Sequence, residues 1–347
     1  MINQVRQKMK ISNMDTLWVT DTHSIEFLTK FHCEVGERFI GLCITQKKAT
    51  LVLNHLFEYK GIEDIDVDYY YDFENIHQVI ENLSSGVVGV DKYMAAKYVL
   101  PLSKTHSLLI GSDCVDSIRA IKNEEEIHKM IEASKLNDYV MSLVPSLLKE
   151  GVSEIEVAKG IEELFHDNGA DGLSFQTIIA FGEHGADPHA VPSDRRLKKY
   201  ESVIVDMGCV LNGYCSDMTR TFFLESNLIK EVYDTVLRAN IKAIESIKAG
   251  SKFSDVDKVA RSIIEEAGYG VNFNHRLGHG IGKEVHEPYD VSASNDALIE
   301  PGMCFSIEPG IYVKDKFGIR IEDLVYVNQE GVAVLLNNYS KKDEVIK

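Results

Sequence analysis

The chain has 347 residues, of which 44% are apolar and 26% charged, a composition typical of a globular protein long enough for two domains. Its formal charge of −17 argues against nucleic acid as a partner, because phosphates would be repelled. No apolar run approaches a membrane span, no apolar signal segment follows the start, and the cysteines lack CxxC spacing, so we expect a reduced, cytoplasmic protein with no membrane partner.

The first third of the chain alternates short apolar runs with helical patterns, which predicts an α/β domain over residues 1–120. Nothing in this part has catalytic spacing. Strands are expected at Phe39–Thr45, Ala49–Leu53 and Val87–Val90. A second domain is expected over residues 121–347.

Two helices are predicted at the start of the second domain. The stretch Ile118–Met130 has an acidic start that suits the positive end of a helix dipole. Ser153 and Glu156 form a capping-box pattern, which opens a helix expected to end before Gly169.

Residues 202–224 have the pattern of two apolar strands joined at Asn212-Gly213, a favoured hairpin turn. If this turn sets the register, Asp206 faces Thr219, and Asp217 lies two residues further along the same pleat. The two aspartates would then be diagonal neighbours about 7 Å apart with both carboxylates on one face. Such like charges repel unless a cation lies between them, although a solvated polar sheet face is the alternative.

A later helix is expected to open at Ser254-Asp255 and to stop at Gly268. Like the helix that opens at Ser153, it follows a glycine. The two helices suggest an internal repeat, and two unrelated capped helices are the alternative.

Three further side chains suit a metal ion. His279 stands in the glycine-rich segment 278–282, expected to be a loop whose backbone can approach a bound group, unless the histidine is only a structural hydrogen bonder. Glu308 precedes the turn signal Pro309-Gly310. Glu322 shares one face of an apolar strand with Arg320.

These side chains form a set of four carboxylates and one imidazole that could bind metal. The set is Asp206, Asp217, His279, Glu308 and Glu322. Oxygen-rich sites with one imidazole suit hard or borderline divalent ions, so we expect two Mn²⁺ ions, with Co²⁺ or Zn²⁺ as substitutes in vitro. The sequence thus predicts a two-metal hydrolase.

At this point the chain resembles, over nearly its whole length, the proline-specific metallopeptidases of the pita-bread fold: the Xaa-Pro dipeptidases (prolidases) and aminopeptidases P. The motifs that carry this resemblance, in order and at family spacing, are Val205–Gly208, Tyr214–Thr221, His275–His286, Ser306–Gly310 and Ile319–Asp323. The resemblance implies an α/β (α+β) protein, with an N-terminal creatinase-like α/β domain before a C-terminal pita-bread catalytic domain.

The resemblance also implies a role for each ligand. Asp217 and Glu322 would bridge both ions, Asp206 would bind one ion, and His279 and Glu308 would bind the other. Glu308 would also accept the proton of the attacking water.

Three more histidines match family positions outside the ligand set. The resemblance implies that His189 contacts the substrate near the scissile carbonyl, that His286 steadies the tetrahedral intermediate, and that His275 lies near the proline or its carboxylate. Imidazole N–H groups there would stabilise charge that builds on oxygen. Arg320 would orient a carboxylate ligand beside the substrate. Satisfied loop histidines are the alternative.

The implied reaction is hydrolysis of an Xaa-Pro bond by a hydroxide that bridges the two metals. Substrates would be small peptides with proline at the second position, selected by an apolar pocket because proline has no N–H to grip. Relatives are usually homodimers, so a homodimer is implied here.

Two other functions stay open. An aminopeptidase P would share every residue named above and differ in admitting longer peptides; we expect a dipeptidase. A non-enzymatic binding protein of the pita-bread fold, or a relative that hydrolyses other C–N bonds, would be expected to have lost metal ligands that this chain keeps.

Overall fold

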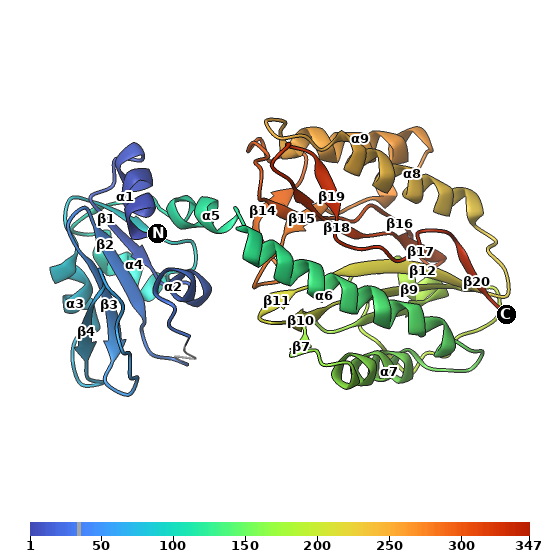
Figure 1. Cartoon of the computed structure of the whole chain (residues 1–347), viewed down its shortest axis with the longest axis horizontal. Helices are drawn as coiled ribbons and strands as arrows, with labels where there is room; N and C mark the ends of the chain where they lie inside the picture. Colours follow the sequence, from blue (N-terminus) through green and yellow to red (C-terminus); the bar gives the residue numbers. More distant parts are fainter. Residues whose placement is uncertain (33–35) are drawn as a thin grey trace. The chain divides into compact units, whose positions relative to one another are not determined.

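The protein divides into two compact units, Met1–Arg119 and Ala120–Lys347, each with its own hydrophobic clusters. The computed structural model describes residues 1–32 and 36–347, and Figure 1 shows both units. Among the described residues, no helix is both long and apolar enough to cross a bilayer. Cysteines 43, 114, 209, 215 and 304 are free thiols, and Cys33 lies outside the described residues.

Unit 1 is a mixed sheet flanked by helices. Its strands lie in the order β4-β3-β2-β1-β5-β6. The helices are α1 (Ile2–Ile11), α2 (Thr22–Thr29), α3 (Ile76–Leu83), α4 (Ala96–Leu102) and α5 (Asp113–Arg119), and the strands are β1 (Thr16–Val19), β2 (Gly41–Thr45), β3 (Ala49–Asn54), β4 (Asp66–Tyr70), β5 (Val87–Val90) and β6 (Ser107–Ile110). Successive residues of β1 supply both faces, because Trp18 packs in one apolar cluster while Leu17 and Val19 pack in the other.

All three strands predicted in this unit are present. Two boundaries differ: β2 begins at Gly41, two residues after Phe39, and β3 ends at Asn54, one residue after Leu53. Phe39 instead packs its ring on Trp18, with centroids 5.8 Å apart.

Unit 2 holds the remaining elements. Its helices are α6 (Glu124–Leu143), α7 (Glu154–Asp167), α8 (Lys230–Ser246) and α9 (Phe253–Glu266), with 3₁₀ turns η1 (Val144–Ser146), η2 (Gly182–Ala186) and η3 (Gly270–Asn272). Its strands are β7 (Gly172–Leu173), β8 (Ile178–Phe181), β9 (Ser202–Met207), β10 (Cys209–Leu211), β11 (Tyr214–Cys215), β12 (Met218–Leu224), β13 (Gly278–Gly280), β14 (Glu287–Val291), β15 (Cys304–Ile307), β16 (Gly310–Val313), β17 (Phe317–Arg320), β18 (Asp323–Val327), β19 (Ala333–Leu335) and β20 (Glu344–Ile346).

Helices cover the strands of unit 2 on both sides. Figure 1 shows α8 and α9 on one side of the strands and α6 and α7 on the other. Two sheets form the interior, ordered β20-β12-β9-β8 and β14-β13-β15-β18-β19. Strand β12 contributes to both cores, because Phe222 packs in the α7 cluster and Phe223 in the α8 and α9 cluster. This is the predicted pita-bread architecture.

The helix starts agree with the sequence in one case and differ in two. Helix α7 has the predicted capping box between Ser153 and Glu156. Helix α6 begins at Glu124 and not at Ile118, because Asn123 caps it; Ile118 belongs to α5, and Ile121 bridges to Met303. Helix α9 begins at Phe253, because Lys252 is its cap and the Lys252 N–H bonds to the Asp255 carboxylate. The proposed repeat of α7 and α9 stays a prediction.

The hairpin that carries two aspartates has the predicted register. Asp206 pairs with Thr219, and the turn residues Asn212 and Gly213 have φ angles of 53° and 74°, as a primed turn requires. The return strand is interrupted, however. Asp217 lies in the gap between β11 and β12, not inside a regular strand.

The glycine-rich segment around His279 is a strand, which corrects the predicted loop. β13 lies between β14 and β15, and its glycines allow unusually close strand packing. A Cβ on Gly278 would lie 1.9 Å from the Ser306 carbonyl oxygen, and one on Gly280 would lie 2.5 Å from the Pro288 carbonyl oxygen. The glycines therefore serve the sheet, and the sheet fixes His279 in the interior.

Candidate metal centre

Three of the predicted ligands meet in the interior of unit 2. Ligand atoms of Asp217, His279 and Glu322 all lie within 4.8 Å of one another. They come from the gap before β12, from β13, and from the gap between β17 and β18. Each of the three residues is at most 4% exposed, so the hairpin, the glycine strand and the C-terminal sheet together bury two carboxylates beside an imidazole.

The His279 ring is oriented by its own backbone. Its Nδ1 lies 3.1 Å from the Gly280 carbonyl oxygen, which places the proton on Nδ1. Its Nε2 lies 3.6 Å from both Asp217 Oδ2 and Glu308 Oε1. Burial, with the neighbouring His286, lowers the pKa of His279 to about 3, so the ring is neutral. A neutral imidazole with Nε2 directed at carboxylates is the form that binds metal.

Ser306 links His279 to Glu308. Its hydroxyl oxygen accepts from the His279 N–H at 3.1 Å and donates to Glu308 Oε1 at 3.3 Å. The Glu308 backbone N–H bonds to the Leu277 carbonyl at 2.8 Å. Glu308 is therefore held beside His279 just beyond the end of β15.

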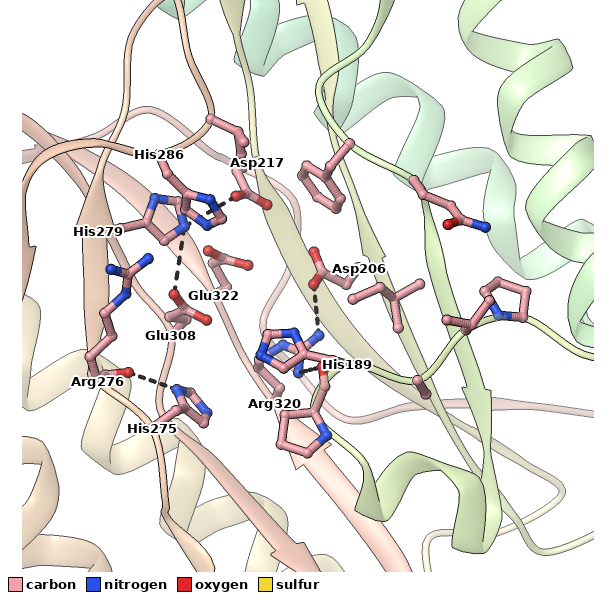
Figure 2. Close-up of a pocket in the computed structure, with 18 residues that line it drawn as sticks. His189, Asp206, Asp217, His275, Arg276, His279, His286, Glu308, Arg320 and Glu322 are labelled. Atoms are coloured by element: carbon pink, nitrogen blue, oxygen red, sulfur yellow. Dashed lines mark hydrogen bonds and ion pairs between the residues drawn. The ribbon is translucent and has the colours of Figure 1, made fainter. Parts of the chain in front are cut away.

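Asp206 lines the same pocket from another wall, as Figure 2 shows. It is not part of the tight group of three, and Arg320 Nη2 binds its Oδ2 at 2.7 Å. Arg320 Nε also donates to the Thr219 hydroxyl at 3.1 Å, and that hydroxyl donates to Glu322 Oε2 at 2.8 Å. Arg320 thus orients one predicted ligand directly and a second through Thr219.

The carboxylates of this site are buried close together and repel one another. Burial and the nearby carboxylates, Glu322 first, hold the pKa of Asp217 well above its usual range. Burial raises the pKa of Glu308 to about 7. Within residues 1–32 and 36–347, Asp206 Oδ1 and Asp217 Oδ1 are buried without a hydrogen-bond partner. Divalent cations would relieve the repulsion and use these orphaned oxygens, so the donor set fits the predicted metals.

The three predicted non-ligand histidines all line the pocket. The His286 ring packs edge-on against His279, with centroids 4.4 Å apart. His189 is solvent-exposed on the facing wall. His275 places Nδ1 2.6 Å from the Arg276 carbonyl oxygen, and burial together with Arg320 lowers its pKa to about 4. His275 is therefore neutral, and its Nε2 can accept a hydrogen bond from the Tyr312 hydroxyl at 3.0 Å.

Two residues of this site were missed in the sequence. The Tyr312 hydroxyl accepts from Arg320 Nη1 at 2.9 Å and lies 3.0 Å from His275 Nε2, so it connects the two predicted residues. Arg276 also lines the pocket. In the part of the chain that the structure describes, its guanidinium makes no hydrogen bond or ion pair. In the sequence Tyr312 lies four residues after Glu308 and Arg276 three residues before His279, but neither position alone indicates its partners.

The rest of the pocket wall is mostly apolar. It includes Phe175, Ile178, Pro188, Ala190, Val191, Pro192 and Val285. Carboxylates and histidines therefore face a surface that can exclude water from a small apolar group.

Comparison with known proteins identifies the family. Residues 128–329 match the model of metallopeptidase family M24, and residues 1–121 match the creatinase/prolidase N-terminal domain. A peptidase of Staphylococcus epidermidis, described as uncharacterized, is 37% identical over 343 residues, which covers 96% of this chain and 98% of its own.

Solved structures agree over the full length. A recombinant prolidase from Thermococcus sibiricus has a TM-score of 0.89 at 32% identity, covering 99% of this chain and 98% of the other. An X-Pro aminopeptidase from Thermotoga maritima has a TM-score of 0.77 at 26% identity, covering 98% and 100%. The chain therefore belongs to metallopeptidase family M24 and is a metallopeptidase with a creatinase/prolidase N-terminal domain before its pita-bread domain.

Proposed function

We propose that this metallopeptidase is an Xaa-Pro dipeptidase that uses two divalent ions, most readily Mn²⁺. The observation that carries the proposal is the buried cluster of carboxylates and a neutral imidazole, with orphaned oxygens, at one side of a small pocket with an apolar wall. The greater similarity to a prolidase structure than to an X-Pro aminopeptidase structure supports the choice of substrate.

Five side chains would hold the ions: Asp206, Asp217, His279, Glu308 and Glu322. Asp217 and Glu322 are the best placed to serve both ions, since they lie between the His279 side and the Asp206 side of the pocket in Figure 2. Once bound, the ions would activate a water molecule and polarise the scissile carbonyl.

Residues of the chain would carry out the proton transfer, the charge stabilisation and the orientation of the ligands. Glu308, held by Ser306, would accept the water proton. His189 and His286 line opposite parts of the pocket and would donate N–H bonds to the oxygen on which charge develops. Arg320 would keep Asp206 in place throughout the reaction.

The apolar wall supports selection of proline. Proline has no N–H, so recognition by backbone hydrogen bonds is lost and contact with its ring remains. Pro188, Val191 and Pro192 offer such contact, while a longer flexible side chain would lose more conformational entropy on binding.

Arg276 supports a dipeptide over a longer peptide. Its guanidinium lies beside Glu308 and His279 in Figure 2 and makes no ion pair among the described residues. A dipeptide carries its terminal carboxylate next to the scissile bond, where an unpaired guanidinium would bind it strongly. An aminopeptidase P needs no cation there, because its substrates continue past proline.

A cytoplasmic location and a homodimer remain predictions from the sequence. A measurement of the mass of the native protein in solution would test the predicted homodimer. Small peptides with proline second are the partners that this proposal requires.

The test is a comparison of peptides. Metal-stripped protein would be assayed with Mn²⁺ restored on an Xaa-Pro dipeptide, an Xaa-Pro-Xaa tripeptide and a matched Xaa-Ala dipeptide. Preferred cleavage of the Xaa-Pro dipeptide, lost without metal, is expected. Preference for the tripeptide would make the protein an aminopeptidase P, and no metal-dependent cleavage of any peptide would refute the proposed exopeptidase.

A further inference from the structure

A buried ion pair lies outside the candidate metal centre. Lys122 Nζ lies 2.8 Å from Glu287 Oε2, and the two side chains are 3% and 4% exposed. Neither residue lines the pocket. Burying a charged pair costs several kcal/mol of desolvation, and an apolar pair of similar volume would often serve stability as well. The pair therefore calls for a reason other than stability.

The Glu287 carboxylate closes a tight turn. Its other oxygen, Oε1, accepts from the Lys283 N–H at 3.0 Å and from the Glu284 N–H at 3.4 Å. Gly282 packs directly on the same carboxylate, since a Cβ there would lie 2.8 Å from both oxygens. The turn 282–287 is thus wrapped around one charged group, and Lys122 supplies the charge that balances it.

The backbone at Lys122 is itself held by a neighbouring segment. It stands just before helix α6, and its backbone N–H donates to the Gly302 carbonyl at 2.9 Å. The preceding residue, Ile121, bridges to Met303. The Lys122 ammonium group is therefore held in place where it contacts the turn through Glu287.

The turn contacts the candidate site at both ends. Cys215, two residues before Asp217, donates its N–H to the Gly282 carbonyl at 2.8 Å. At the other end His286 directly precedes Glu287, and its ring packs on His279 with centroids 4.4 Å apart. The His286 side chain itself is solvent-exposed and lines the pocket.

We propose that Lys122 and Glu287 are a positioning pair for His286. The ion pair fixes the turn 282–287, and the turn fixes the His286 imidazole in the pocket beside His279. Neither Lys122 nor Glu287 touches the substrate. The kinetic consequence rests on the proposed peptide hydrolysis, whereas the fixing of the turn does not depend on any activity.

The first test measures the turn itself. Hydrogen–deuterium exchange by mass spectrometry would compare the full-length wild-type protein with Glu287→Gln and with Lys122→Met, on peptides that cover residues 281–289. Both variants are expected to exchange roughly tenfold faster in this segment, because protection is lost when the turn opens locally. Arg119→Met is the matched control, since it removes a buried pair with Asp21 in unit 1 and should leave this segment unchanged.

The second test uses a double-mutant cycle with His286→Ala. Glu287→Gln is expected to lower kcat at least about tenfold with little change in KM, and to lower it less than about twofold once His286 is absent. Lys122→Arg should retain most of the activity, because the charge is kept. Glu287→Gln keeps an acceptor oxygen for the turn. It therefore provides a second variant for the test if the Lys122→Met protein does not fold.

Two results would overturn the proposal. One is unchanged exchange of residues 281–289 in a folded Glu287→Gln protein. The other is an additive effect of Glu287→Gln and His286→Ala on kcat, which would mean that the pair acts independently of His286. If wild-type protein hydrolysed no Xaa-Pro peptide, the proposed function would fail, and the exchange measurement alone would still decide on the positioning pair.

Discussion

Single hydrogen bonds decide how each side chain of the metal centre is presented. Nδ1 of His279 is occupied by the Gly280 carbonyl, so Nε2 is the only ring nitrogen available to a metal. Asp206 and Glu308 each keep one oxygen engaged, by Arg320 and by Ser306. Among the described residues, Asp206 Oδ1 and Asp217 Oδ1 have no hydrogen-bond partner, so these oxygens and Nε2 are available to a metal.

Arg276 is the residue that should separate dipeptides from other substrates. We expect Arg276→Met to lower kcat/KM for an Xaa-Pro dipeptide by about 10- to 100-fold, the value of one charge-assisted hydrogen bond. The same variant should cleave the Xaa-Pro amide, which lacks the carboxylate, within about twofold of wild type. Steady-state kinetics on this acid and amide pair measures both numbers.

Arg238→Met, on the exposed face of α8, is the control and should change neither substrate. Equal losses on the acid and the amide would contradict a role for Arg276 in carboxylate binding.

For single residues, the sequence predicted those that stand in motifs but not the side chains that they contact. The five candidate ligand positions each stand in a short motif with a turn or strand signal, and all five line one pocket. Tyr312 could not be predicted, because its role depends on Arg320 and His275, which reach it from other strands. Arg276 was not predicted, because an arginine beside a histidine in the sequence cannot be told from a solvated surface charge. Its lack of a hydrogen-bond or ion-pair partner among the described residues is visible only in the structure.

Close strand packing in unit 2 is what turns these motifs into one site. β13 can lie against β15 only because Gly278 has no side chain, and that contact carries His279 toward Glu308. The sequence suggested a loop here, since glycine-rich segments usually are loops. The hairpin register was predictable, by contrast, because a local two-residue turn sets it.

Gly278→Ala tests the close packing. The new Cβ would lie 1.9 Å from the Ser306 carbonyl oxygen, so the strands must separate. We expect a loss of about 3 kcal/mol in the free energy of unfolding, the upper part of the range for overpacked positions. Denaturant unfolding measures this loss against Gly172→Ala, where a Cβ meets nothing within 4 Å. Equal stability of the two variants would show that β13 adapts easily.

The helix boundaries show where local patterns mislead. Ser153 caps α7 as predicted because its side chain and that of Glu156 bond within one turn. Ser254 does not cap α9: Lys252 is the cap residue, and the Ser254 hydroxyl instead donates to Asp296 from a distant loop. A cap can be predicted from sequence only where no distant partner competes for it.

At the scale of the whole molecule, buried charge links stability to metal. Burial raises the pKa of Glu308 to about 7, so its contribution to stability is complete below its ordinary value near 4.5 and is lost as pH rises through 7. Asp217 and Glu322 act in the same direction. Burial lowers the pKa of His275 to about 4 and of His279 to about 3, so their contribution is complete above pH 6.5 and is lost as pH falls.

Of these groups, the carboxylates are the ones that titrate above pH 6.5. We therefore expect the Tm of metal-free protein to fall between pH 6.5 and 8, and added Mn²⁺ to remove most of that fall, because a cation binds the ionised form. Differential scanning calorimetry with and without Mn²⁺ measures both curves. A metal-free Tm that stays constant or rises over this interval would contradict the electrostatic description of the site.

The central claim is that unit 2 binds two divalent ions on five named side chains. The most direct measurement is the number of Mn²⁺ ions retained per chain, by elemental analysis after dialysis, for wild type, Asp217→Asn and the exposed control Asp234→Asn. We predict two ions for wild type and for the control, and the loss of at least one ion in Asp217→Asn. A wild-type protein that retains no Mn²⁺, or an Asp217→Asn protein that retains as much as wild type, would contradict the claim.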